Sequence, residues 1–226
     1  MLLLVTDTSG RHGAIALARA IERDPRDPEV IDVAPLAGGT FSAQLVPQIA
    51  ALLQKCGLGK ADIDGFVVVS GPGSFTGLRV GLAAIKALAE ILKKPIVPVS
   101  LLEVLALASR ALGKVAAVLD GGRGEVYFGA YEIAGESVQV LQEQLLSKAD
   151  FLSAAAESTI ATPDLALAEV ARDAGLSVVA VAPPNPEMIA RFGWKKLQTG
   201  ETVTPEQLEA NYMRRSDAEL FVKKSL

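Results

Sequence analysis

The chain has 226 residues and a net charge of −4, with 22 basic and 26 acidic side chains, and half of its residues are hydrophobic. This length allows one large domain or two small ones, and the apolar half can fill a sizeable core. The slightly acidic balance argues against a protein that binds nucleic acid by itself, because neutralising phosphates requires a basic surface.

The compartment is predicted from three absences in the sequence. The single cysteine, Cys56, excludes an intrachain disulfide and fits a reducing environment. Residues 1–5 are too short an apolar run for a signal peptide and are followed by Thr6 and Asp7. No apolar run reaches about 18 residues, so no transmembrane helix is expected. We therefore expect a cytoplasmic protein that does not contact a membrane.

Hydrophobic periodicity predicts two halves of similar design. The first half has strands at 3–7 and 13–18, a helix at 42–56, a strand at 66–70, a helix at 76–93 and a strand at 96–99. An apolar helix at 101–112 marks the boundary. The second half has strands at 116–119 and 125–131, helices near 148–156, 163–174 and 186–198, and strands near 158–162 and 177–181.

This alternation of strands and helices predicts an α/β protein with mixed sheets flanked by helices. We place a first lobe at residues 1–100 and a second lobe at residues 101–203. The final segment, residues 204–226, is a candidate to return to the first lobe.

An aspartate ends the first strand of each half. Asp7, followed by Thr8 and Ser9, can hold a metal through water while the hydroxyls donate to a phosphate. The favoured alternative is that Asp7 caps its own turn. The counterpart in the second half consists of Asp120, Arg123 and Glu125. This group is either a second anion loop or, as we favour, an arginine–carboxylate pair that satisfies itself.

The most specific string, residues 71–81, lies between a predicted strand and a predicted helix. Its loop residues are Gly71, Pro72, Gly73, Ser74, Phe75, Thr76, Gly77 and Arg79. Glycines before a helix N-terminus suit an anion or a tightly docked second chain, and the alternative is a purely structural turn. The spacing matches neither a P-loop nor G-x-G-x-x-G.

The helix at 76–93 carries more apolar surface than one buried face needs. At 100° per residue, Arg79, Lys86, Glu90 and Lys93 share a stripe about 60° wide, and the remaining arc is apolar. The helix at 42–56 is also apolar, so the pair predicts an interface between chains, with burial under the second lobe as the alternative. The candidate contacts are Leu45, Ile49, Leu52, Leu78, Leu82, Ala84 and Ile85.

The chain is poor in residues for metal or triad chemistry. One histidine, His12, and one cysteine cannot build a usual zinc site. We predict no metal site and no catalytic residue in this chain.

Four strings together resemble the TsaB (YeaZ) family, whose members are accessory proteins in the synthesis of threonylcarbamoyladenosine on tRNA. The strongest is the signature at 71–81, and the others are residues 3–9, 119–127 and 211–214. The resemblance covers nearly the whole chain, and it implies a two-lobed actin-like fold (the ASKHA, ribonuclease-H-like class).

The resemblance also implies a function. The chain would be a non-catalytic subunit in forming N6-threonylcarbamoyladenosine at position 37 of tRNA, and would bind the TsaD catalytic subunit through the helices at 42–56 and 76–93. A TsaE-type ATPase would join the complex, and tRNA would be met only there. The isolated chain would be a homodimer without a cofactor, because ATP and metal belong to the partner subunits.

Under this resemblance the anion loops are vestigial, but two enzyme classes remain as alternatives. An actin-like ATPase or phosphotransferase would use Asp7 and Asp120, although no Gly-Gly adenosine segment is evident in the second half. A glycoprotease-type metallopeptidase is disfavoured because the helix at 42–56 lacks the histidine pair of the family's catalytic relative.

Overall fold

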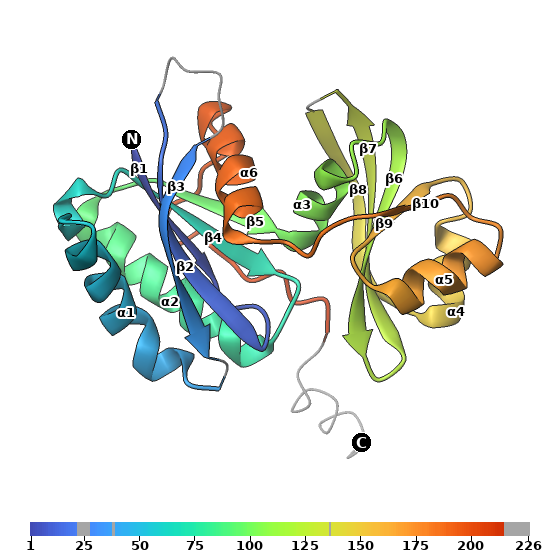
Figure 1. The fold of residues 1–226 in the computed structure, drawn as a ribbon, viewed down its shortest axis with the longest axis horizontal. Coiled ribbons are helices and arrows are strands. Elements are labelled where there is room, and N and C mark those ends of the chain that lie inside the picture. Colours follow the sequence, from blue (N-terminus) through green and yellow to red (C-terminus); the bar gives the residue numbers. More distant parts are fainter. Residues whose placement is uncertain (22–27, 38, 136, 215–226) are drawn as a thin grey trace. The chain divides into compact units, whose positions relative to one another are not determined.

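The computed structural model describes residues 1–21, 28–37, 39–135 and 137–214, which form two compact units (Figure 1). The first unit contains residues 1–100 and 185–211, and the second contains residues 101–184 and 212–214. Residues 185–203, which we had placed in the second lobe, thus pack with the first unit. Of the final segment, residues 204–211 belong to the first unit, and residues 215–226 lie outside the described residues.

The first unit is built on a five-stranded mixed sheet in the order β3-β2-β1-β4-β5. The strands are β1 (Leu2–Asp7), β2 (His12–Arg19), β3 (Glu29–Ala37), β4 (Gly65–Gly71) and β5 (Ile96–Ser100). β1 pairs antiparallel with β2 and parallel with β4, so that Leu4 lies opposite Leu17 and Phe66. β1 and β4 are almost continuous apolar runs because both of their faces are covered.

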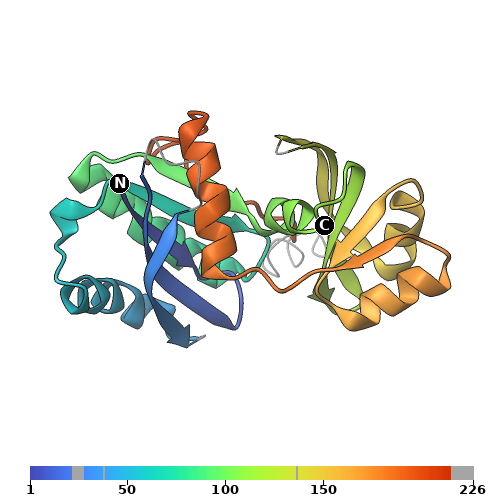
Figure 2. The same ribbon diagram turned by 45° about the horizontal axis from the view of Figure 1, so that its top comes forward.

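Helices cover both faces of this sheet. α1 (Phe41–Lys55) and α2 (Phe75–Leu92) lie side by side on one face, and α6 (Pro186–Gln198) lies on the other (Figures 1 and 2). A short 3-10 turn, η1 (Lys60–Asp62), leads from α1 toward β4. The main core lies between the sheet and the α1/α2 pair.

The second unit repeats this plan with the strand order β10-β9-β6-β7-β8. Its strands are β6 (Gly113–Gly122), β7 (Glu125–Ala134), β8 (Ser137–Ser147), β9 (Thr159–Thr162) and β10 (Val178–Ala180). α3 (Leu101–Ala108) packs on one face of the sheet, and α4 (Lys148–Ala154) and α5 (Leu165–Asp173) pack on the other.

The two sheets have the same topology. In each case the helix that follows the last strand of one sheet packs in the other unit. α3 follows β5 directly in the chain but packs in the second unit, whereas α6 follows β10 and packs on the first sheet. The strand order β3-β2-β1-β4-β5 and its repeat are the actin-like, ribonuclease-H-like arrangement, so the predicted fold class is confirmed.

Two strands of the structure were missed in the sequence. β3 and β8 each form one edge of their sheets, and nearly all of their residues are exposed or only partly buried. Half-exposed strands with interspersed polar side chains give a weak periodic signal, and β3 also contains Pro35. α3 ends at Ala108, earlier than the expected 112. Of the helices described, none is long and apolar enough to cross a membrane.

Candidate functional site

The end of β1 is a turn organised by Asp7. Its Oδ1 atom accepts hydrogen bonds from the Ser9 amide at 2.8 Å and from the Ser9 hydroxyl at 2.6 Å. Burial raises the pKa of the Asp7 carboxyl, and the hydrogen bonds from Ser9 act in the opposite direction. Of the two arrangements considered for this turn, the geometry is that of an aspartate capping its own backbone.

The signature glycines bring α2 into contact with this turn. A Cβ atom on Gly77 would lie closer than 3.0 Å to the Thr8 carbonyl oxygen, and one on Gly81 would lie equally close to Thr8 Oγ1. A Cβ atom on Gly73 would lie 2.6 Å from Ser9 Cβ. Real Cβ atoms do not approach this closely, so glycine is required at these three positions for the observed packing.

Hydrogen bonds join the same segments. The Ser74 amide donates to the Ser9 carbonyl at 2.6 Å, and the Gly77 amide donates to Ser74 Oγ at 3.3 Å. The Thr8 hydroxyl donates to the Gly77 carbonyl at 2.8 Å. The amides of Ser74 and Gly77 are therefore bound within the chain itself and do not point to a phosphate. The string at 71–81 holds two segments of one chain together.

Asn211, the first residue of the C-terminal string at 211–214, contacts the start of the string at 71–81 in the first unit. The Asn211 amide donates to the Ser70 carbonyl at 2.8 Å. Gly71 has a φ of 148°, and a Cβ atom there would lie 2.7 Å from the Asn211 carbonyl oxygen. Two strings separated by more than a hundred residues in the sequence are therefore in direct contact.

The second aspartate lies in the hairpin between β6 and β7. Asp120 Oδ1 accepts a hydrogen bond from the Gly122 amide at 3.2 Å, again two residues further on. Arg123 occupies the hairpin tip with a φ of 57°, between Gly122 and Gly124, both of which also have positive φ. Turn geometry, which needs positive φ at three successive residues, accounts for this glycine-rich sequence.

Glu125 forms an ion pair with Arg214, a residue that we had not paired with it from the sequence. Glu125 Oε2 lies 2.6 Å from Nη2 of Arg214, which also donates to the Gly121 carbonyl at 2.7 Å. The Arg214 guanidinium lies 6.0 Å from the centre of the Tyr127 ring. We had favoured a pair within the loop, but Arg214 comes from the C-terminal string, and no local spacing could have indicated it.

The expected interface residues lie on the wrong side of their helices. Six of them are at most 5% exposed and face the sheet as core: Leu45, Ile49, Leu52, Leu78, Leu82 and Ile85. Ala84 alone is half-buried. A second chain cannot reach the six buried side chains without opening the first unit, so this choice of contacts is corrected.

The opposite side of α1 and α2 is also rich in apolar side chains. This outer face is formed by Ala43, Val46, Ala50, Ala83, Ala87 and Ile91, and Val80 and Ala84 lie at its margin, where they also pack against the core. Val46 is 54% exposed and Ile91 is 70% exposed. Along one edge of α2 it is bordered by the charged stripe of Arg79, Lys86 and Glu90. The apolar excess predicted for α2 is therefore present on the outside, where it consists of alanines and the large side chain of Ile91.

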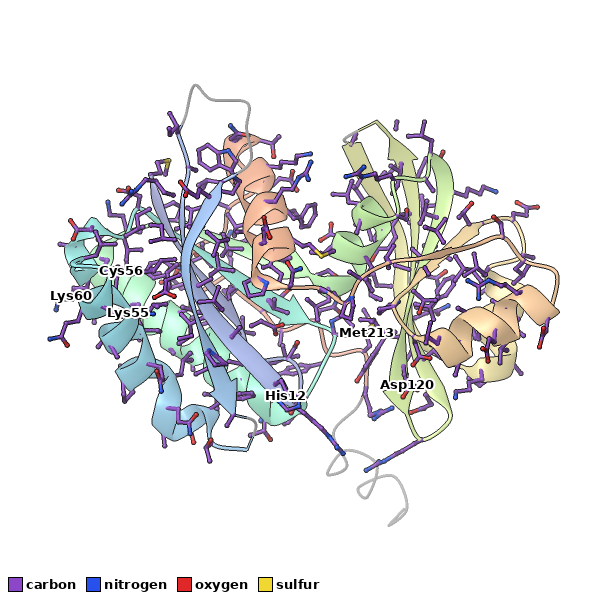
Figure 3. All side chains as sticks on the ribbon, in the orientation of Figure 1. His12, Lys55, Cys56, Lys60, Asp120 and Met213 are labelled. Atoms are coloured by element: carbon purple, nitrogen blue, oxygen red, sulfur yellow. The ribbon has the colours of Figure 1, made fainter. Side chains whose placement is uncertain are left out.

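No metal-binding group forms within the described ranges, since no three His, Cys, Asp or Glu side chains there come together. Figure 3 shows His12 at the start of β2 and Cys56 beyond the end of α1, well apart in the first unit.

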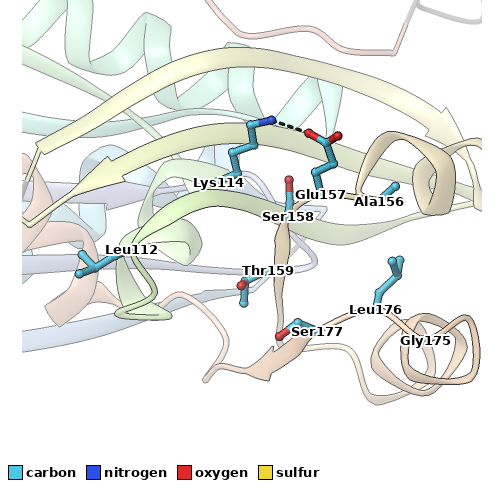
Figure 4. Close-up of a pocket in the computed structure, with 9 residues that line it drawn as sticks. All are labelled: Leu112, Lys114, Ala156, Glu157, Ser158, Thr159, Gly175, Leu176 and Ser177. Atoms are coloured by element: carbon cyan, nitrogen blue, oxygen red, sulfur yellow. Dashed lines mark hydrogen bonds and ion pairs between the residues drawn. The ribbon is translucent and has the colours of Figure 1, made fainter.

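A hollow of about 340 Å³ lies on the second unit (Figure 4). Lys114 and Glu157 form an ion pair of 2.6 Å beside it, and Ser158, Thr159 and Ser177 line it. These residues lie at or near the amino ends of β6, β9 and β10, which run parallel. Ligands of α/β sheets bind beyond the carboxyl ends of strands, so the position of this hollow does not indicate an active site.

Comparison with known proteins gives consistent matches. The model of the family TsaD, tRNA N6-adenosine threonylcarbamoyltransferase, matches residues 33–200. The tRNA threonylcarbamoyladenosine biosynthesis protein TsaB of Bacillus subtilis is 35% identical over 67% of this chain and 65% of its own length. The protein of the same name from Haemophilus influenzae is 34% identical over 57% of this chain and 52% of its own length. These alignments cover less than two thirds of either relative.

A crystal structure from Pseudomonas aeruginosa extends the match to nearly the whole chain. It is described as an uncharacterized protein with similarity to peptidase YeaZ, and it superposes with a TM-score of 0.69 and 26% identity. The match covers 94% of this chain and 99% of that one. Two sheets of one topology define the class as two-lobed actin-like proteins. Within this class, the chain belongs to the TsaB (YeaZ) family.

Proposed function

We propose that this chain is a non-catalytic partner subunit in the formation of N6-threonylcarbamoyladenosine on tRNA. The names of the relatives from Bacillus subtilis and Haemophilus influenzae support the process, and the matching family model supports kinship with the transferase. The observation that carries the accessory role is the outer face of α1 and α2, where two adjacent helices expose apolar side chains. Contiguous apolar surface of this kind is typical of interaction sites.

The occupant we propose is a TsaD-type catalytic subunit. One family model describes this transferase and matches this chain, so the partner is expected to carry two equivalent helices. Related surfaces can pair about a pseudo-two-fold axis, as identical ones do in a homodimer. Alanines at 83, 84 and 87 leave room for a helix of the partner to approach closely.

The remaining components belong to the partners in this proposal. ATP and metal are bound by the other subunits, a TsaE-type ATPase joins the complex, and tRNA is contacted only there. In isolation the chain pairs with a second copy through the same outer face, so the partner and the second copy compete.

The test is a charge on the outer face. Ala87→Glu and Ala50→Glu each place a carboxylate at an exposed position of α2 or α1, and Ala166→Glu makes the same change on exposed α5. Burying an unpaired carboxylate in an interface costs several kcal/mol, and about 4 kcal/mol is a thousandfold in affinity. We expect Ala87→Glu and Ala50→Glu each to abolish co-elution of this chain with a TsaD homologue. We also expect each variant to abolish tRNA modification when it replaces the original chain in an assay with the partner subunits.

The control variant, Ala166→Glu, should bind and support modification normally, and all three variants should keep the melting temperature of the original chain. If both outer-face variants bind the TsaD homologue as tightly as Ala166→Glu does, the docking role of α1 and α2 is refuted. Loss of self-association alone, with the TsaD homologue still bound, would assign this face to a homodimer.

A further inference from the structure

We propose that Thr8 is a positioning residue that fixes α2, and with it the outer face, in the orientation needed for docking. This inference rests on the proposed function, since it concerns the surface through which the partner is bound. It gives the turn at residues 7–9 a role different from anion binding.

The contact between Thr8 and α2 is closely fitted. The Thr8 side chain is 2% exposed, and its hydroxyl donates to the Gly77 carbonyl at 2.8 Å. Gly77 and Gly81, one helical turn apart, both lie against Thr8 without room for a Cβ atom. A single threonine therefore contacts two successive turns of α2 through one hydrogen bond and two backbone approaches.

This contact is directional, like the hydrogen bond from the Ser74 amide to the Ser9 carbonyl just before α2, whereas the apolar packing of the helix body is not. α2 otherwise meets the sheet through Leu82, Ile85 and Ala89, whose apolar contacts vary little with small slides or rotations. A buried hydrogen bond requires a narrow range of distance and angle. The bond from Thr8, the one made within the body of α2, therefore sets the rotation and register of the helix together with the bond from the Ser74 N-cap amide, while the apolar residues supply most of the packing energy.

Because α2 is a rigid helix, fixing it at Gly77 and Gly81 also fixes the position of its exposed residues further along. Ala87 and Ile91 lie six and ten residues beyond Gly81, about 9 and 15 Å at 1.5 Å per residue. A rotation by one residue would turn the exposed side by about 100° and bring charged residues into the contact. Apparent affinity falls in proportion to the fraction of molecules in which α2 is correctly placed.

The first experiment uses Thr8→Val, which keeps the shape and removes the hydroxyl. We expect at least tenfold weaker binding of a TsaD homologue, measured by calorimetry, with the fold retained. The matched control is Val67→Ala, because Val67 is buried against Gly193 of α6 on the opposite face of the sheet. That variant should lower the melting temperature by as much or more and still bind with normal affinity.

A second experiment separates the hydrogen bond from space filling. Gly81→Ala alone should disrupt binding, because its Cβ atom would overlap Thr8 Oγ1. Adding Thr8→Ala removes that atom and leaves the two Cβ atoms 3.3 Å apart, a tight contact that a shift of a few tenths of an ångström would relieve. We expect the double variant to recover part of the melting temperature that Gly81→Ala loses, but not the affinity, since the overlap with Oγ1 is relieved and the hydroxyl is absent.

The outcomes distinguish this inference from the proposed function. Normal affinity in Thr8→Val, together with loss of binding in Ala87→Glu, would overturn the positioning role and leave docking intact. Recovery of affinity in the double variant would also overturn it, since packing alone would then suffice. If Ala87→Glu binds normally, the docking face itself is wrong, whatever Thr8→Val does.

Discussion

At the scale of single residues, Asp7 couples the stability of the first unit to pH. Burial raises its pKa above the ordinary value of 3.8, so the folded chain keeps the proton at pH values where the unfolded chain has lost it. The stability due to this proton is complete below pH 3.8 and is lost as pH rises through the folded-state pKa. At neutral pH the ionised carboxylate is therefore a cost, partly offset by the hydrogen bonds from Ser9.

We predict that Asp7→Asn is more stable than the original chain at pH 7. The amide oxygen can still accept both hydrogen bonds from Ser9, and the buried charge is gone. The advantage should shrink as pH falls toward 4, where the carboxyl of the original chain becomes protonated. Urea unfolding curves between pH 4 and pH 8 measure this difference. An unchanged or lower stability of Asp7→Asn at pH 7 would show that the charge itself is stabilised at this site.

The glycine at 77 gives a second prediction at this scale. Gly77→Ala would place a methyl group into the Thr8 carbonyl, and overpacking of this kind costs about 3 kcal/mol when the backbone must shift. Gly59→Ala is the matched control, because the nearest atom to its Cβ would be 3.7 Å away. Thermal unfolding should separate the two variants, with Gly59→Ala within about 0.5 kcal/mol of the original chain. Equal melting temperatures would mean that α2 can move away freely.

At the scale of elements, the exchange of α3 and α6 ties each unit to the other half of the chain. α6 is amphipathic and is preceded by its N-cap residue Asn185, whose side-chain oxygen accepts a hydrogen bond from the Met188 amide at 2.9 Å. Its buried side, including Ile189 and Trp194, packs on the first sheet although it follows the second sheet in the sequence. The first unit is therefore incomplete until residues 185–211 have been added.

This exchange predicts which unit each helix stabilises. Ile189→Ala in α6 and Leu167→Ala in α5 both remove a buried aliphatic side chain, at a cost of about 2–5 kcal/mol each. Hydrogen exchange should rise in β1, β4 and β5 for Ile189→Ala, and in β6, β7 and β9 for Leu167→Ala. Trp194 is the sole tryptophan, so its fluorescence reports on the first unit. Faster exchange in β6 and β9 alone for Ile189→Ala would contradict the assignment of α6.

At the scale of the whole molecule, charge bears on what the chain can bind. With 26 acidic and 22 basic side chains, it lacks the excess of positive charge that binds phosphate backbones without sequence preference. Within the proposed complex, tRNA would then be held by the partner subunits.

We predict that the isolated chain does not retain tRNA in a filter-binding assay at about 0.15 M salt and about 0.1 µM protein, a concentration below the dissociation constants typical of non-specific binding. The same tRNA should be retained once a TsaD homologue is present. Omitting the chain while keeping the homologue is the control for binding by the homologue alone. Submicromolar binding by the chain itself, with a steep salt dependence, would refute the assignment of tRNA binding to the partners.

The sequence by itself determined the features that depend on local pattern. The buried strands β1, β4, β6 and β9 have apolar runs between turn residues, and glycine strings mark the turns, so the fold class and the family resemblance could be predicted from them. The self-capping of Asp7 is also local, because its partner lies two residues further on.

Only the tertiary structure decided which surfaces and distant residues meet. α2 has two apolar sides, and periodicity cannot say which one the sheet covers, so the buried side, Leu78, Leu82 and Ile85, was mistaken for the interface. The pairing of Glu125 with Arg214 spans 89 residues, and the transfer of α6 to the first sheet spans still more. An apolar face gains about the same packing energy against any complementary surface, so its residues do not specify their partner. The tertiary path of the chain decides which distant segments come into contact.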